Sequence, residues 1–422
     1  MGDVLESPTS AEHGRGTRVL KALLALVVVP LIVGTIVVLL LATTPWGNER
    51  ARRIVVSQAN QRLTGELSID RLRGNLLSGA ALTNVQLLDR LHHPVFAARR
   101  VDVRYGLLSA LRGKVVIQSL VLDTPVVVLD KRPGERWNFQ SLMKPSTTPK
   151  DTTKKSVPPE LRDITIRHGR FLYRRPWLPD STLPSVKRED AVARALDPSA
   201  RKRTVRVPGG YQRVLDYRNI DARLPSVRIA QGGAPTAVVI GALSMLAEPY
   251  RPPAIDIKSL VGTLYASKDS LWWRGARMVM PGSKVSGDGK IGFHRSGFTL
   301  DLAGAPIAFA DLRWLDPKLS PVGGGNVRYR MRFVGDTAEF GINDADLRYG
   351  DASIVGNATV ARVTATGRPS EMLVKGADLT IAHLTTATIH ELAPSLKLKR
   401  SGTLDGHVVV SAPTTRAPEI RR

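Results

Sequence analysis

The chain contains no cysteine among its 422 residues, and aromatic residues make up only 5% of it. The absence of cysteine excludes disulfide bonds, thiol catalysis and cysteine-rich zinc sites. Scarce aromatics weaken any function that depends on stacking against nucleic-acid bases. Acidic residues are few beside basic ones, 37 against 61, which leaves a formal net charge of +24. Such a balance indicates contact with a polyanion or an anionic membrane surface and says nothing about fold.

Charge is absent altogether from one long segment, Ala22 to Ala42. As a helix these residues would span roughly 31 Å, which matches the hydrocarbon core of a bilayer. The segment is longer than the apolar region of a signal peptide, and no clean A-x-A cleavage site follows it. It therefore predicts a single uncleaved transmembrane helix. Because basic residues flank both ends, we base the orientation on length and expect residues 1–21 to be a cytoplasmic tail and the long remainder to lie outside the cytoplasm.

After this segment, residues 43–65 have apolar positions at roughly helical spacing and end at Gly65, which predicts a juxtamembrane helix. From Glu66 onward, short runs rich in Val, Ile, Leu and Thr alternate with turn residues, so the predicted fold class is mainly β with few short helices. The run "VVIQSLVLDTPVVVLD" predicts two strands broken at Pro125.

Composition divides the β-region into two parts. Residues 66–142 form a first β-module, and the polar, Pro/Thr/Lys-rich stretch 143–160 is the predicted linker. A second β-region covers 161–422. It is interrupted by a basic insertion at 185–206, part of which could be helical, and by a short predicted helix near Ile381 to Pro394.

No motif predicts an active site. "GDGKIG" at 287–292 satisfies G-x-G-x-x-G, but another strand pattern follows it where a dinucleotide site needs a helix, so a hairpin turn is the better interpretation. The eight histidines are scattered without metal-ligand spacing, and no G-x-S-x-G elbow occurs. We expect no catalytic, cofactor-binding or metal-binding residues and no enzyme activity.

The stretch "NVRYRMRFVGD", Asn326 to Asp336, has strict period-two alternation. It predicts a strand with one apolar face and one face of three arginines. Three interpretations of the arginines are open: solvent-facing residues without a ligand, attraction to anionic lipid headgroups or lipopolysaccharide, and nucleic-acid binding. The predicted anchor and the scarce aromatics argue against nucleic acid, which we do not expect as a partner.

Several stretches together resemble the AsmA-like / TamB family, which includes the inner-membrane subunit of the translocation and assembly module. They are "GELSIDRLRGNLLSGAALTNVQLLD" (65–89), "VFAARRVDVRYGLLSALRGKVVIQSLVLDTPVVVLD" (95–130) and "GERWNFQSL" (134–142), which follow the predicted membrane helix. The resemblance is specific over 65–142 and diffuse later. Family chains are usually longer, so this one would be a short member or an N-terminal part. The basic insertion is not a feature we associate with the family.

The resemblance implies a curled, groove-forming, antiparallel-rich β-sheet anchored in the inner (plasma) membrane, with the bulk of the chain in the periplasm. It implies transport of phospholipids towards the outer membrane. The alternative it implies is a scaffold that assists outer-membrane protein or autotransporter assembly with a β-barrel partner. Under the groove interpretation, the candidate lipid-lining residues are the apolar positions of four alternating strands: Val101, Val103, Tyr105, Ile255, Ile257, Leu300, Leu302, Val327, Tyr329, Met331 and Phe333. The competing architecture is a closed sandwich or barrel with an ordinary core, which alternation alone does not distinguish.

Overall fold

The computed structural model describes residues 45–74, 78–106, 116–144, 160–230, 233–293, 297–363, 371–392 and 401–411. Within these ranges the protein is mainly β. The helices are α2 (Pro45–Arg62), α4 (Ser185–Leu196), α5 (Phe309–Leu312) and α6 (Thr386–Leu392), and a 3-10 turn, η1, covers Asn138–Ser141. The strands are β1 (Glu66–Arg73), β2 (Gly79–Leu88), β3 (Pro94–Tyr105), β4 (Val116–Asp123), β5 (Val126–Asp130), β6 (Glu160–Trp177), β7 (Thr204–Val207), β8 (Gly210–Arg228), β9 (Thr236–Ile240), β10 (Ala242–Glu248), β11 (Ile255–Ile257), β12 (Ser259–Ala266), β13 (Ser270–Val279), β14 (Lys284–Gly292), β15 (Phe298–Ala308), β16 (Gly324–Val334), β17 (Thr337–Tyr349), β18 (Ala352–Val363), β19 (Glu371–Thr385) and β20 (Thr403–Val410).

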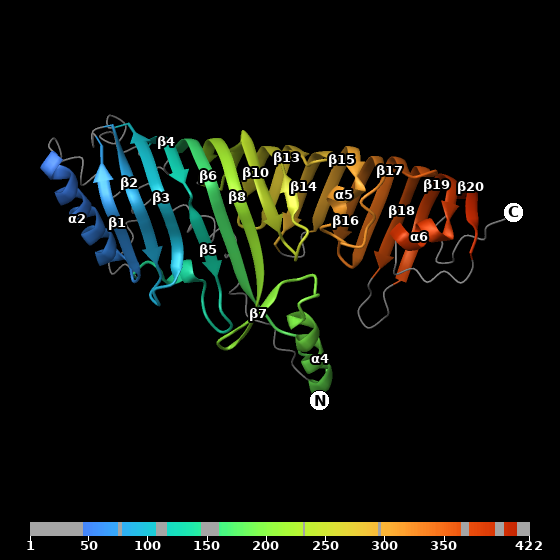
Figure 1. Ribbon diagram of the computed structural model, residues 1–422, viewed down its shortest axis with the longest axis horizontal. Helices are drawn as coiled ribbons and strands as arrows, with labels where there is room; N and C mark the ends of the chain where they lie inside the picture. The colour runs from blue at the N-terminus through green and yellow to red at the C-terminus, as the bar shows by residue number, and fades with distance from the viewer. Residues whose placement is uncertain are drawn as a thin grey trace.

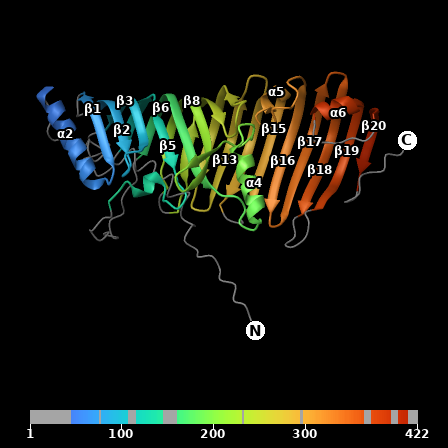
Figure 2. The same ribbon diagram turned by 60° about the horizontal axis from the view of Figure 1, so that its bottom comes forward.

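All of these strands belong to one sheet. Pairing runs from β1 through β2 to β3, and both β4 and β5 lie between β3 and β6. These two strands run parallel to β6, and every other pairing is antiparallel. The sheet continues through β8, β9 and β12, and from β12 to β20 each strand pairs with the next. Figures 1 and 2 show one long row of strands from α2 to β20.

The sheet is open at both ends. Among the described strands, β1 pairs only with β2 and β20 pairs only with β19. Closure into a barrel would require these two end strands to pair, and a sandwich would require a second sheet. The described part of the chain therefore has neither of the two closed architectures that compete with an open sheet.

A buried apolar cluster lies at the N-terminal end of the sheet. It is formed by α2, β1 to β6, η1 and the end of β8, and it includes Val101 and Leu142, whose exposed fraction is 0%. From α2 it takes Ala51, Val55 and Ala59. These residues recur every fourth position, so they form one apolar stripe that packs against the sheet.

Helix α2 also covers the free edge of β1. The side-chain amide of Asn60 donates to the carbonyl of Leu67 (3.1 Å) and accepts from its backbone N–H (2.7 Å). The guanidinium of Arg52 donates to the carbonyl of Ile69 at 2.8 Å. These contacts satisfy backbone groups that an edge strand otherwise leaves available for pairing with another chain.

Bulges of one design recur along the sheet. In four antiparallel pairs, one residue with positive φ interrupts the register, and its backbone N–H donates to the side-chain oxygen of an Asp or Asn on the neighbouring strand. The donor and acceptor pairs are His168 with Asp221, Gly275 with Asp288, Asp344 with Asn357, and His383 with Asp405. Bulges increase the local right-handed twist of the strands that contain them.

Several expected elements are present. Helix α2 lies within the expected 43–65, and β4 and β5 are separated at Thr124 and Pro125 as predicted. The basic insertion contains α4 and most of β7. The helix expected near 381–394 is confirmed only for α6, because residues 381–385 continue strand β19. The expected tail 1–21, the expected transmembrane helix 22–42 and most of the linker 143–160 lie outside the described residues. Of the helices that are described, none has the length and apolar character needed to cross a membrane.

The prediction of a hairpin turn at 287–292 is wrong, because these residues lie inside β14. Two of the glycines serve the sheet itself. Gly287 has φ of 153° at the position opposite the bulge of β13, where an added Cβ would lie 2.0 Å from the carbonyl oxygen of Asp301. Gly289 lies beneath a tryptophan ring, as described below. A strand that must accept close neighbours on both sides uses glycine without being a turn.

Candidate functional site

Cross-strand pairing forms one continuous apolar row across the sheet. Paired residues share a face, so each pairing extends the row by one strand. The row begins on β3 and ends on β19, with one residue from each strand that it crosses. In order, its members are Tyr105, Ile117, Leu161, Val227, Val238, Leu264, Trp273, Gly289, Leu300, Met331, Phe340, Val360 and Val374.

Burial along this row changes abruptly between β8 and β9. Ile117, Leu161 and Val227 are exposed by only 3%, 1% and 2%, because they lie in the closed N-terminal core. From Val238 to Val374 every side chain in the row is only half-buried, and the one fully buried position is a glycine. The same apolar face therefore leaves the closed core and continues, half-buried, across the later strands.

The apolar face is several rows wide in the C-terminal half. Leu302 pairs with Tyr329, which pairs with Ile342, and Phe298 pairs with Phe333. The rings of Phe298 and Phe333 have centroids 5.2 Å apart. Phe333 and Ile342 are exposed by 37% and 38%. A contiguous exposed apolar surface of this kind is unusual in a soluble monomer and indicates a binding surface.

Trp273 fills the one gap in the row. A Cβ built on Gly289 would lie 2.1 Å from the Trp273 ring, so the indole of β13 lies directly over the backbone of β14. This arrangement keeps the row apolar at a position that has no side chain of its own. It also makes Trp273 the broadest apolar surface of the row.

The structure places the eleven candidate residues in three groups. Val101 and Val103 are buried in the closed core, and Tyr105, which packs against that core, is the first member of the row. Ile255 and Ile257 lie on the short strand β11, paired with Ala247 and Met245 of β10. The remaining six, Leu300, Leu302, Val327, Tyr329, Met331 and Phe333, lie together on β15 and β16, and Leu300 pairs directly with Met331.

Sequence reasoning missed most of the open part of the row, since only Leu300 and Met331 of its members were among the candidates. Val238 was not a candidate, and neither were Leu264, Trp273, Phe340, Val360 and Val374, although each of these five belongs to an apolar position of its strand. Alternation in β12, β13, β17, β18 and β19 could have suggested them. Bulges reverse the alternation within three of these strands, β13, β17 and β19, so their sequence does not show which of two sets of residues shares the face.

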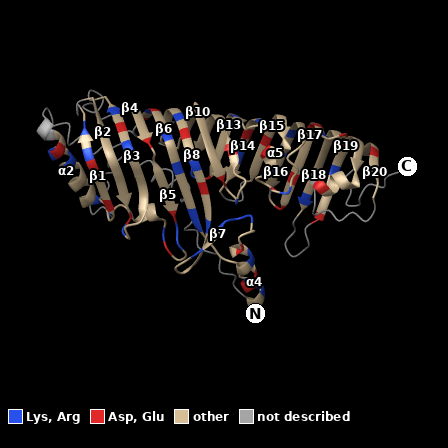
Figure 3. Cartoon of the chain, in the orientation of Figure 1, with Lys and Arg blue, Asp and Glu red and all other residues tan. Residues whose placement is uncertain are grey.

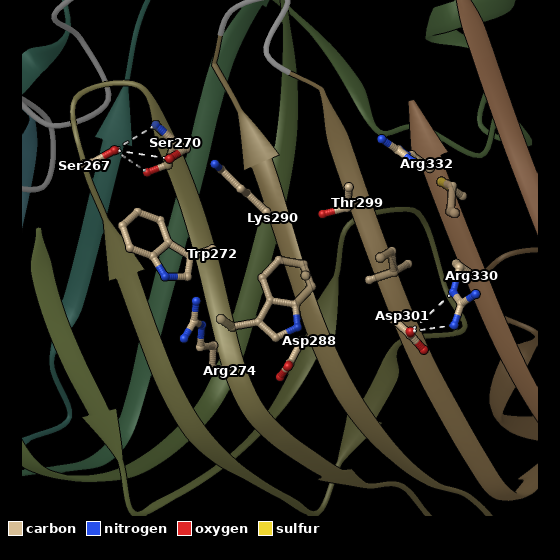
Figure 4. A pocket seen from close by; sticks show the side chains of 14 residues that line it. Ser267, Ser270, Trp272, Arg274, Asp288, Lys290, Thr299, Asp301, Arg330 and Arg332 are labelled. Atoms are coloured by element: carbon tan, nitrogen blue, oxygen red, sulfur yellow. Dashed lines mark hydrogen bonds and ion pairs between the residues drawn. The ribbon is translucent and has the colours of Figure 1, made fainter. Parts of the chain in front are cut away.

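The opposite face of the same strands is polar. Figure 4 shows Trp272, Arg274 and Lys290 around a depression of about 800 Å³, whose lining also includes Asp301 and Arg330 and reaches Trp273, Leu300 and Met331 of the row. Figure 3 shows that acidic residues are interspersed with Lys and Arg along the strands. The charged groups of this face are partly neutralised within the sheet, as the arginines of β16 illustrate.

Two of the three arginines in "NVRYRMRFVGD" bind one aspartate of β15. Arg328 and Arg330 are 3.1 Å and 3.2 Å from the carboxylate of Asp301, and all three groups are substantially exposed. Burial opposes ionisation of Asp301, but the hydrogen bonds from these arginines outweigh it and hold the pKa below its ordinary value. The arginines therefore lie on the polar face, opposite the apolar row.

The apolar face offers contact surface and little reactive chemistry. Burial raises the pKa of Tyr329 above its ordinary value, so the phenol stays neutral on this face at physiological pH. The described residues contain no group of three or more His, Asp or Glu side chains positioned to hold a metal ion. What this arrangement can do is cover apolar chains of a ligand.

Comparisons with known proteins add no assignment. No protein-family model, no curated protein and no solved structure matches the chain.

Proposed function

We propose that the protein is a membrane-anchored, AsmA/TamB-like β-groove that binds the acyl chains of phospholipids and conducts them towards the outer membrane. The observation that carries this proposal is the apolar row that leaves the closed core at Val227 and continues, half-exposed, to Val374. A curled sheet with this face inside would place acyl chains where a sandwich places its second sheet. The segment 22–42 would hold the sheet at the inner membrane, with the bulk of the chain in the periplasm.

The physical basis is burial of apolar surface without covalent chemistry. Each Å² of acyl chain removed from water contributes about 25 cal/mol. The row is almost entirely aliphatic and aromatic, so an acyl chain that moves from one strand to the next meets a surface of similar chemistry. Binding energy is then nearly constant along the sheet, which permits a lipid to slide.

Site-specific photo-crosslinking tests the proposal in the full chain within its membrane. A photoreactive phenylalanine analogue placed at Met331 should form adducts with phospholipid, detected by mass spectrometry. The same analogue at Arg332, the next residue on the opposite face, is the matched control and should form few. Equal lipid adducts at both positions, or none at either, would contradict an acyl-chain groove on the apolar face.

A charge placed on the face gives a second readout. The variant Met331→Lys should keep its β-sheet content, because the side chain is only half-buried, but should retain much less co-purifying phospholipid. Thr299→Lys on the exposed polar face of β15 is the control. A folded Met331→Lys variant that retains the same lipid as the unsubstituted protein would refute the proposal.

A second candidate function is strand addition to a barrel partner, and the edge of β20 favours it. The sheet has two end strands, β1 and β20, to which a partner strand could add. Helix α2 covers the edge of β1, whereas β20 has a described neighbour on one side only. Crosslinks to an outer-membrane β-barrel should therefore form from β20, and crosslinks from residues 66–73 alone would contradict this version.

A further inference from the structure

The apolar face changes character at one end of β6. Side chains of a strand alternate between faces, so Phe171, Tyr173, Arg175 and Trp177 share one face. Phe171 pairs with Val127, and both pack against the closed core, which identifies this face as the apolar one. Burial raises the pKa of Tyr173 while the positive charge of Arg175 opposes the rise, which places that guanidinium near the phenol. The apolar face thus ends here in an arginine and a tryptophan.

Strand β8 repeats the same change beside β6. Tyr173 pairs with Leu215, Arg175 pairs with Arg213, and Trp177 pairs with Tyr211. The guanidinium of Arg213 lies over the Trp177 ring, 4.7 Å from its centroid. Two arginines therefore lie side by side on this face, Arg175 between Tyr173 and Trp177, and Arg213 between Leu215 and Tyr211.

The basic insertion contributes a third arginine to this face. Its strand β7 pairs with the beginning of β8 and sets Arg206 opposite Tyr211. The guanidinium of Arg206 is 5.8 Å from the centre of that ring. In Figure 3, Lys and Arg are concentrated where β6 and β8 approach β7. We define Arg175, Arg206 and Arg213 as the rim arginines.

The rim arginines lack a counter-charge. Elsewhere in the sheet arginines bind carboxylates, as Arg170 binds Asp216 at 2.7 Å, but within the described residues none of the rim arginines forms an ion pair with an acid. Like charges placed directly opposite on paired strands are destabilising. Burial, followed by the charge of Arg175, lowers the pKa of Arg213 below its ordinary value. An anion bound between these arginines would relieve this repulsion.

We propose that the rim arginines bind the phosphate of a phospholipid headgroup whose acyl chains lie on the adjoining apolar face. This inference rests on the proposed function and specifies where the headgroup of its substrate binds. The planar guanidinium binds phosphate oxygens through two parallel hydrogen bonds, which suits arginine better than lysine for this role. Trp177 and Tyr211 lie at the boundary of apolar and charged surface, where amphipathic aromatic rings are favoured. The basic insertion, through β7, completes the site.

The experiment compares two short-chain lipids that differ only in the headgroup. Dioctanoyl phosphatidylglycerol and dioctanoylglycerol are titrated against the full chain in a lipid-free amphipathic polymer, with inorganic phosphate as a third probe. The variant Arg175→Gln/Arg213→Gln should bind the phospholipid at least about tenfold more weakly than the unsubstituted protein, as expected for loss of charge-assisted hydrogen bonds. Its binding of dioctanoylglycerol should be unchanged.

Two variants make the result specific. Lys187→Gln/Arg188→Gln removes the same charge from α4, where both side chains are exposed, and should bind the phospholipid like the unsubstituted protein. Arg175→Lys/Arg213→Lys keeps the positive charge but lacks the paired N–H donors of the guanidinium, and should bind the phospholipid with intermediate affinity. Circular dichroism of each variant confirms folding independently of lipid.

The outcomes separate this inference from the proposed function. Suppose that the unsubstituted protein binds both lipids and that Arg175→Gln/Arg213→Gln binds the phospholipid equally well. This result would overturn the headgroup site and leave the groove intact. Failure of every form to bind either lipid would overturn the groove and the headgroup site together. Arginine-dependent binding of inorganic phosphate without binding of the phospholipid would also overturn the proposal, because the site would then serve a free anion.

Discussion

The same substitution at two positions of the apolar row should have very different effects on stability. Leu161 and Leu300 belong to one row, but Leu161 is exposed by 1% inside the closed core and Leu300 is half-buried on the open face. Leu161→Ala leaves a cavity and should cost about 2–5 kcal/mol. At about 0.8 kcal/mol per buried carbon, a half-buried leucine that opens to solvent should lose only about 1 kcal/mol when shortened to alanine.

Hydrogen exchange measured by mass spectrometry on the full, delipidated chain reports these two costs locally, in peptides from β6 and from β15. A local readout is needed because a long sheet of this kind need not unfold as one cooperative unit. Addition of phospholipid should slow exchange in β15 and leave the β6 peptide around Leu161 unchanged. A cost at Leu300 as large as that at Leu161 would mean that this face is covered, and the reasoning for an open groove would fail.

Three further perturbations test particular contacts. Burial raises the pKa of Tyr105 to about 12, so the contribution of the neutral phenol to stability is complete below pH 10 and is lost as the pH rises towards 12. An ultraviolet titration of the protein, compared with that of Tyr105→Phe, should assign a phenol pKa of about 12 to Tyr105. Titration of this phenol near pH 10 would contradict its burial. Hydrogen bonds from neighbouring arginines, Arg52 first, lower the pKa of Glu49 to about 2, so the contribution of this carboxylate to stability is present above pH 4.5 and is lost as the pH falls towards 2. In Arg52→Gln, the pKa of the Glu49 carboxyl measured by NMR should move back towards 4.5. An unchanged pKa in this variant would refute the pairing. Gly289→Val should displace the indole of Trp273, shift its fluorescence to the red and destabilise the protein. The same substitution in a Trp273→Ala background should cost much less stability. Equal losses of stability in both backgrounds would show that the ring does not lie over the glycine.

The family resemblance and the structure bear on different parts of the proposal. The resemblance covers residues 65–142, which the structure places in the closed core and the helix-covered edge. The acyl-chain surface proposed here lies beyond that region, on β9 to β19, and the headgroup site lies on β6 to β8, where the resemblance is also diffuse. The proposed groove therefore depends on pairing and burial in the second β-region and can fail or succeed independently of the resemblance.

Local patterns in the sequence determined much of the secondary structure. Alternation in 326–336 predicted β16 with its apolar and arginine faces, and a proline between two aliphatic runs predicted the break between β4 and β5. These features depend on residues close in sequence, because side-chain direction in a strand alternates regardless of what lies nearby. The pairing of Arg328 with Asp301 was not predictable, since it joins two strands across a loop.

Tertiary structure alone decided which apolar positions are closed and which are open. Val101 and Met331 have the same alternating pattern around them, yet Val101 is fully buried and Met331 is half-exposed. The difference comes from α2 and η1, which pack on the N-terminal strands, while no described element covers the later ones to the same extent. The register of the strands decided which residues share a face. Bulges reverse the alternation within strands, so only the strand pairing shows that Tyr105 and Val374 are the two ends of one apolar row. Burial and register depend on partners distant in sequence, and a pattern within one strand does not encode them.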